Sequence, residues 1–194
     1  MITLDILTID GVSQDLARVR HALDHEQGIL EVAGAAGERR LQDHFQQRNE
    51  TPNQRGFTRR NFWAGLAQVT GPTNVAGSEA IVTVNDPAFN LKVFGGDIRP
   101  KRGRALAIPE TDLAYQAGSP SEGGIAGLWL FQYQDKDGKL RAALATGDKD
   151  DPTIHYWLVG GASQDADPDA LPADDAFEAA LAEAFDDWFG ALGL

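Results

Sequence analysis

The sequence has no cysteine, and its 194 residues include only one methionine, three tyrosines and four histidines. Without cysteine the chain forms no disulfide, no thiolate metal site, no redox pair and no cysteine nucleophile. No apolar run approaches the roughly 20 residues of a membrane-spanning helix, so we expect no transmembrane anchor. The N-terminus lacks a basic region followed by an apolar stretch, so we expect a protein that begins in a cytoplasm.

Bases are also few, with 17 Lys and Arg against 29 Asp and Glu and a net charge of −12. Nine of the acids lie between Asp165 and Asp187, a stretch that contains no base. The rest of the chain holds 20 acids and 17 bases, so basic patches can still form there. A protein that coats DNA generally is therefore not expected.

The first third of the chain predicts mainly helices. Alternation over 2–9 predicts a strand, and apolar residues spaced by three and four predict helices over about 12–27 and 29–48. Gly34 and Gly37 weaken the second helix, which predicts a kink or a close packing contact there. A short helix is expected over 62–68.

The middle of the chain predicts strands. Residues 75–84 and 106–108 have strand-like patterns, and an apolar set over 89–94 is closed by a glycine pair. The strongest signal is Asp137-Gly138 between the runs 128–133 and 140–144, which is typical of a β-hairpin. Residues 154–159 predict a further strand, in which we expect His155 to be packed or hydrogen-bonded.

The last segment, 174–192, predicts an amphipathic helix with acids at its N-terminus, where the helix dipole favours them. The element order predicts an α+β fold, a mostly antiparallel sheet with N-terminal helices and a C-terminal amphipathic helix packed on it. We expect a single domain over 1–194. Within it we expect exposed loops at 49–61 and 97–105 and a linker at 162–173.

Motifs for catalysis are weak. His21 and His25 have the spacing of zinc ligands on a helix, but no third ligand is evident. Asp135–Gly138 begins like a calcium loop, yet Thr146 stands where such a loop ends in Glu, so a turn is preferred. Asp148–Asp151 is likewise interpreted as a solvated turn. With no glycine-rich phosphate motif and no nucleophile elbow, we expect no enzyme and no cofactor.

A basic segment over 99–104 stands apart, and a second basic cluster lies in the loop 49–61. A solvated loop is one interpretation, and a contact surface for an acidic partner or for phosphates is the other. The acidic start of the C-terminal helix would suit such a basic loop of a neighbouring identical subunit, as in a head-to-tail ring. The candidate contact residues are Arg55, Arg59, Arg60, Arg99, Lys101, Arg102, Arg104, Asp174, Asp175 and Glu178.

The sequence FGGDIRPK at 94–101, followed by ALAIP at 105–109, resembles the F-G-G-x-I-x-P-K … L-x-I-P stretch of phage virion morphogenesis proteins, the tail-completion or neck proteins. The resemblance runs in order from about residue 36 to the C-terminus and departs from the pattern in 99–104 and at Gly160-Gly161. The other stretches that carry it are 41–45 with 49–56, 62–64, and 162–168 with 171–172.

This resemblance implies a non-enzymatic structural protein of a tailed phage or prophage, which completes the tail or joins it to the head. It implies a homo-oligomeric ring around the DNA channel, located in the virion after assembly in the host cytoplasm. The implied partners are portal-side connector or tail-tube proteins and, non-specifically, the DNA. Two other classes stay open: a DNA-contacting accessory factor that uses the basic residues, and a metal-dependent hydrolase that uses His21, His25 or Asp148–Asp151.

Overall fold

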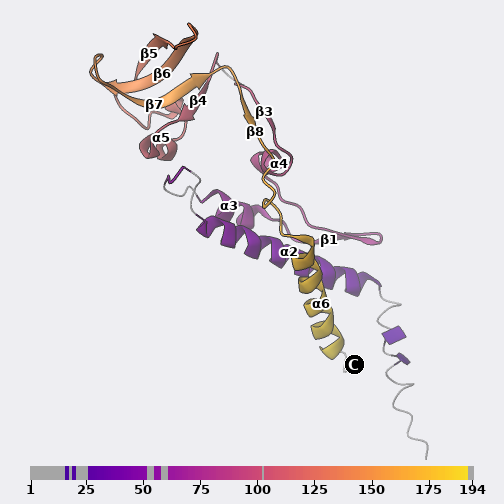
Figure 1. The fold of residues 1–194 in the computed structure, drawn as a ribbon. Helices are drawn as coiled ribbons and strands as arrows, with labels where there is room; N and C mark the ends of the chain where they lie inside the picture. Colours follow the sequence, from indigo (N-terminus) through magenta and orange to yellow (C-terminus); the bar gives the residue numbers. More distant parts are fainter. Residues whose placement is uncertain are drawn as a thin grey trace, which may run out of the picture. The chain divides into compact units, whose positions relative to one another are not determined.

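The computed structural model describes residues 16–17, 19–20, 26–51, 55–57, 61–101 and 103–191. The predicted α+β class is confirmed, because helices combine with antiparallel sheets (Figure 1). The strand expected over 2–9 lies outside the described residues, as does much of the helix expected over 12–27. No helix within the described ranges is long and apolar enough to cross a membrane.

The chain divides into two compact units, whereas the sequence predicts one domain. The single domain stays a prediction. Unit 1 comprises Met1–Phe45, Leu66–Asn85 and Leu171–Leu194, and unit 2 comprises Gln46–Gly65 and Asp86–Ala170. The helices α2 (Glu26–Glu50) and α3 (Phe62–Val69) each contribute residues to both units. Both helices match the ranges expected from their apolar spacing.

The core of unit 1 contains buried side chains from α2 and α3. Leu41 and Phe45, four residues apart and therefore on one face of α2, are buried together with Leu66 of α3. The buried Thr70 hydroxyl donates a hydrogen bond to the Leu66 carbonyl at 2.8 Å. Both helices thus contribute fully buried apolar side chains to the core of unit 1.

The close packing expected at Gly34 of α2 is confirmed. A Cβ atom at Gly34 would lie 2.0 Å from Cγ2 of Thr73, whereas one at Gly37 would meet nothing within 4 Å. Thr73 is held in place by Glu38, which accepts hydrogen bonds from the Thr73 backbone N–H at 2.9 Å and from its hydroxyl at 3.3 Å. Only the first of the two glycines is therefore required by packing.

Residues 75–84 do not form the single strand expected of them. They contribute to a hairpin of β1 (Asn74–Ala76) and β2 (Glu79–Ile81), which turns at Gly77 with a φ of 62°. The left-handed backbone at Gly77 favours glycine and reverses the chain. The single strand was expected because residues 81–84 alternate in polarity, and that pattern gives no sign of the turn at Gly77.

The helix α6 (Asp174–Ala191) confirms the expected C-terminal helix; it belongs to unit 1, and its packing on the antiparallel sheet stays a prediction. Phe177, Leu181, Phe185 and Trp188 lie on one side and are half-buried. A Cβ atom at Gly28 of α2 would lie 3.8 Å from the Trp188 ring, so the two helices meet there. The acids of α6 are exposed.

Unit 2 is built on a four-stranded antiparallel sheet in the order β4-β7-β6-β5 (Figure 1). Its strands are β4 (Leu106–Pro109), β5 (Trp129–Gln134), β6 (Leu140–Gly147) and β7 (Pro152–Val159). The predicted hairpin is confirmed, with Trp129 opposite Ala145 and Gln134 opposite Leu140. A register shift between Leu144 and Ala145 marks a bulge toward β7.

The short helix α5 (Asp112–Ala117) packs on this sheet and has no counterpart in the sequence prediction, nor has the 3₁₀ turn Pro120–Glu122. The buried Tyr156 hydroxyl of β7 donates to the Ala114 carbonyl of α5 at 3.1 Å. His155 is buried, and hydrogen bonds join its Nδ1 to the Thr111 hydroxyl (3.0 Å) and its Nε2 to the Thr146 hydroxyl (2.9 Å). The prediction of a packed, hydrogen-bonded histidine is confirmed.

The apolar set at 89–94 belongs to a helix, α4 (Pro87–Phe94). Asp86 caps it by accepting hydrogen bonds from the N–H groups of Ala88 (2.7 Å) and Phe89 (3.3 Å), and Pro87 occupies the first turn. The Asp-Pro pair, which the sequence pattern indicates as the end of a strand, is here the start of a helix, since proline is favoured at the first helical position.

Two short strands of unit 2 were not predicted. β3 (Gly96–Ile98) pairs antiparallel with β8 (Ala162–Gln164). The segment 162–173 therefore begins with a strand rather than a linker, and the loop expected at 97–105 begins within β3. Three-residue strands carry too little periodicity to be recognised from sequence.

A substitution pair in α2 tests the close contact at Gly34. We expect Gly34→Ala to lower the free energy of unfolding by about 1–3 kcal/mol, because the added methyl overlaps a threonine held by Glu38. Gly37→Ala is the matched control and is expected to raise the free energy of unfolding by about 1 kcal/mol through helix propensity alone. Urea unfolding followed by circular dichroism measures both, and equal effects would contradict the contact.

Candidate functional site

The basic segment lies on a chain excursion between β3 and β4. The pairs Ile98–Ala162 and Leu106–Val159 flank it, so residues 99–105 stand opposite only Gly160 and Gly161. Because seven residues on one side stand opposite two on the other, the longer segment cannot pair in register and protrudes from the sheet. Arg99, Lys101 and Arg104 are exposed, and Arg102 lies outside the described residues.

The second basic cluster is placed in part. The Arg55 guanidinium donates to the Pro109 carbonyl at 3.0 Å and lies 3.8 Å from the Glu110 carboxylate. Arg55 thus binds at one end of β4, the strand whose other end follows the basic excursion. Arg59 and Arg60 lie outside the described residues.

The candidate acids belong to the other unit. Asp174, Asp175 and Glu178 lie exposed in the first turns of α6, within unit 1. Unit 1 carries 15 acidic and four basic residues, a net charge of −11, whereas unit 2 carries 14 and 13, a net charge of −1. The charge excess of the chain is therefore almost entirely a property of unit 1.

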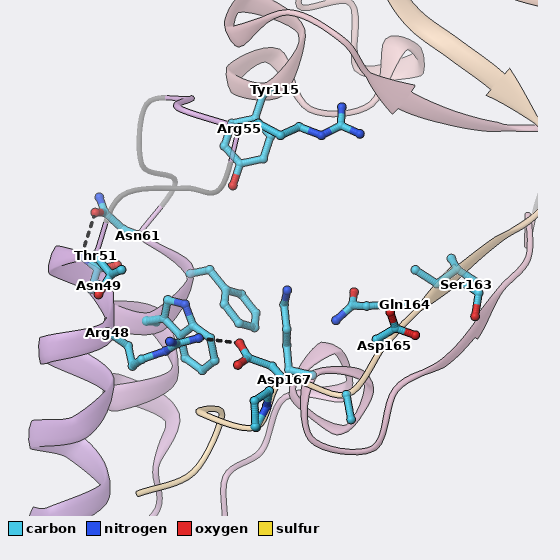
Figure 2. Close-up of a pocket in the computed structure, with 16 residues that line it drawn as sticks. Arg48, Asn49, Thr51, Arg55, Asn61, Tyr115, Ser163, Gln164, Asp165 and Asp167 are labelled. Atoms are coloured by element: carbon cyan, nitrogen blue, oxygen red, sulfur yellow. Dashed lines mark hydrogen bonds and ion pairs between the residues drawn. The ribbon is translucent and has the colours of Figure 1, made fainter.

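Unit 2 also contains a cleft of about 820 Å³ that the sequence analysis did not predict (Figure 2). Arg48 and Asn49 at the end of α2 form one wall together with Thr51, which follows the helix, and residues 163–168 form another. The cleft is completed by Arg55, Asn61, Phe62, Trp63, Lys92, Ile98 and Tyr115.

Arg48 is the central contact of this cleft. Its guanidinium forms a close ion pair with Asp167, as Figure 2 shows, and lies 3.7 Å from the Asp169 carboxylate. The same guanidinium stacks over the Trp63 ring at 4.8 Å, a cation–π contact. At the C-terminal turn of α2 the positive charge is also favoured by the helix dipole.

The neighbouring backbone of Asp167 is anchored as well. Its N–H donates to the Lys92 carbonyl at the end of α4 at 2.8 Å, and its carboxylate accepts from the Asp169 N–H at 3.1 Å. The polar contacts of the cleft therefore fix four separate chain segments to one another: the ends of α2 and α4, the start of α3, and residues 163–169.

The Asp135–Gly138 sequence forms the preferred turn. The Asp135 carboxylate accepts hydrogen bonds from the N–H groups of Asp137 (3.0 Å) and Lys139 (2.9 Å) and from Nε of Arg141 (2.7 Å). The bond from Arg141, and next that from Lys139, hold the pKa of Asp135 below its ordinary value. The carboxylate oxygens of Asp135 thus accept hydrogen bonds that stabilise the turn of the β5–β6 hairpin.

Metal-binding alternatives gain no geometric support. His21 and His25 lie outside the described residues, and Asp148–Asp151 is an exposed turn in which Asp148 accepts from the Asp150 N–H at 3.3 Å. Throughout the ranges that the structure describes, no three His, Asp or Glu side chains are grouped so as to hold a metal ion.

In comparisons with protein-family models, with curated proteins and with solved structures, the chain has no significant match. Its function must therefore be inferred from its own residues.

The Arg48 contacts predict a specific need for arginine. We expect Arg48→Lys to lower the free energy of unfolding by about 1–2 kcal/mol, because lysine keeps the charge but loses the planar stacking on Trp63 and the spread of the guanidinium between Asp167 and Asp169. Arg55→Lys, in an exposed pair, is the control and is expected to change it by less than about 0.5 kcal/mol. Urea unfolding monitored by tryptophan fluorescence compares the two, and similar losses would contradict the role of Arg48.

The Asp135 carboxyl predicts a pH effect. Because its folded pKa lies below the value of about 3.9 usual for an unfolded chain, its ionised form stabilises the hairpin above that pH. The contribution is lost as pH falls through the folded pKa. A carbon-13 NMR titration should show a higher Asp135 pKa in Arg141→Gln than in wild type, and none of this rise in the control Lys136→Gln.

Proposed function

We propose that the protein is a non-enzymatic structural protein of a tailed phage or prophage, which acts in tail completion or head-tail joining as an oligomeric ring around the DNA channel. Its location is then the virion, after assembly in the host cytoplasm. Portal-side connector or tail-tube proteins are its partners.

The cleft in unit 2 supports this proposal most directly. Twelve of its sixteen lining residues come from the stretches that resemble phage virion morphogenesis proteins, namely 49–56, 62–64, 94–101 and 162–168. These stretches are separated by up to about a hundred residues of chain, yet they meet around the ion pair of Arg48 with Asp167. Because the stretches that carry the resemblance lie around one contact network, they support an architecture of unit 2 similar to that of phage virion morphogenesis proteins.

The distribution of charge supports the head-to-tail contact. The exposed acids Asp174, Asp175 and Glu178 belong to the strongly acidic unit 1, and the exposed bases Arg99, Lys101 and Arg104 belong to unit 2. Two unlike surfaces on one subunit let each copy bind the next in a ring. Charge complementarity would then set the orientation of neighbouring copies.

A DNA-contacting accessory factor is the alternative that a specific observation favours. Arg99, Lys101 and Arg104 are exposed on an excursion for which the described residues provide no sheet pairing. Bases of this kind bind phosphates without sequence preference, and such binding weakens steeply with salt.

The proposal predicts salt-sensitive assembly. Light scattering behind size exclusion should show species larger than a dimer at low salt, and the double substitution Arg99→Glu with Arg104→Glu should raise the protein concentration needed for them at least about tenfold. Lys136→Glu with Lys149→Glu changes the charge equally on other exposed turns of unit 2 and should leave assembly unchanged.

Complementary reversal sharpens the test. Asp174→Lys with Asp175→Lys should also raise the protein concentration needed for assembly at least about tenfold, and mixing the two reversed proteins should restore assembly, because opposite charges again face each other. If the Arg99 and Arg104 variant assembles normally but no longer binds labelled DNA, the subunit contact is wrong and the DNA-contacting alternative replaces it.

A further inference from the structure

The two edges of the four-stranded sheet are protected very differently. β4 has four residues and ends in Pro109, whose carbonyl is already bound by Arg55. β5 has six residues, WLFQYQ, with no charge, proline or glycine, and no strand among the described residues pairs with its outer side. Soluble proteins protect their edges with short strands, proline and charge, since free edge groups bind other strands. β5 has none of these protections.

The backbone groups on the outer side of β5 can be assigned. The Asp135 N–H donates to the Lys139 carbonyl at 3.0 Å, so these residues form a hydrogen-bonded pair at the end of the hairpin. Hydrogen-bonded and non-hydrogen-bonded pairs alternate along an antiparallel ladder, and the register of β5 with β6 is unbroken. The N–H and C=O groups of Leu130, Gln132 and Gln134 therefore point away from β6.

The other residues of β5 form an aromatic row on one face of the sheet. Ring centroids lie 5.8 Å apart for Trp129 and Phe131, and 5.7 Å apart for Phe131 and Tyr133. The row continues to Trp157 of β7, 6.1 Å from Tyr133. α5 packs on the opposite face, because Tyr156, which binds it, alternates with Trp157.

We propose that β5 pairs antiparallel with β5 of a second copy of this chain, across a two-fold axis at Phe131. In this register Phe131 faces its own counterpart, and Trp129 faces Tyr133 of the second copy. The outward groups of Leu130 meet those of Gln132 of the second copy, so both edges are satisfied. Two four-stranded sheets become one, and aromatic cross-strand pairs join the two rows.

Charge favours a second copy as the occupant. Unit 2 has a net charge of only −1, and β5 itself has none, so two such units approach with little repulsion. Leu130, 54% exposed in the single chain, lies at this edge and gains apolar contact in the pair. The contact is apolar and self-complementary, so it goes beyond the salt-sensitive, head-to-tail contact proposed above.

The first test blocks the edge without breaking the sheet. Gln132→Pro removes an outward N–H, which β6 does not use, and proline is tolerated on an edge strand in that orientation. In 1 M NaCl, which suppresses the charged contact, we expect wild type to form a dimer by light scattering. Gln132→Pro should raise the dimer dissociation constant at least about tenfold, and the control Gln132→Thr should leave it within about twofold.

The second test uses the absence of cysteine. Phe131→Cys would place two thiols across the axis at a non-hydrogen-bonded pair, where Cα atoms about 4.5 Å apart lie within disulfide range. We expect rapid oxidation to a covalent dimer under oxidised glutathione. Lys136→Cys, exposed on the adjacent turn, is the control and should cross-link at least about tenfold more slowly.

The outcomes separate the two proposals. A wild-type protein that stays monomeric in 1 M NaCl up to high concentration overturns β5 pairing, as does a folded Gln132→Pro that dimerises like wild type. If Gln132→Pro does not fold, the cysteine comparison decides, and equal cross-linking at 131 and 136 overturns the register. Slow amide exchange at Leu130 and Gln132 in a monomer would assign the edge to another segment of the same chain. None of these results bears on charge-dependent assembly at low salt.

Discussion

The arrangement of unit 2 depends on how the C-terminal end of α4 is closed. The chain leaves α4 through Gly95 with a φ of 66°, and a Cβ atom there would lie 2.8 Å from the Gln164 carbonyl and from the Ala166 N–H nitrogen. Only glycine permits both the backbone angle and this approach. Residues 164–167 can therefore satisfy the end of the helix: the Asp167 N–H binds the Lys92 carbonyl, and the Gln164 amide lies 3.5 Å from the Leu91 carbonyl. A helix end is thus capped by a segment some seventy residues away.

The same closure of α4 also positions the residues of the cleft. Because Asp167 is held at the end of α4, its carboxylate is available to Arg48, and the guanidinium can rest on Trp63 at the same time. β3 follows Gly95 directly and pairs with β8, so the same closure fixes where the basic excursion leaves the ladder. In a chain with no disulfide, a network of one glycine, one ion pair and two short strands sets the position of the exposed bases.

The sequence indicates the long elements well and the distant contacts poorly. Periodicity and the Asp-Gly turn were sufficient for α2, α3, α6 and the β5–β6 hairpin, where local pattern and tertiary structure agree. α4 was hidden because Asp86-Pro87 serves equally as a strand stop and a helix cap. The bases of the excursion were found by composition. The pairing of Arg48 with Asp167 spans 119 residues and leaves no local signal, so the cleft could be found only from the fold.

The basic residues of the proposed head-to-tail contact and the proposed β5 contact lie at opposite edges of one sheet. The basic excursion precedes β4 and the aromatic row begins on β5, so the strand order separates them by the width of four strands, about 14 Å. Within unit 2, the basic residues of the first contact and the strand of the second therefore do not compete for one edge. A head-to-tail contact whose rotation closes gives a ring, whereas a two-fold contact joins identical faces, so the two proposed contacts together would give dihedral symmetry with two stacked rings. Since the first contact is ionic and the second apolar, salt would dissolve the rings into dimers rather than single chains.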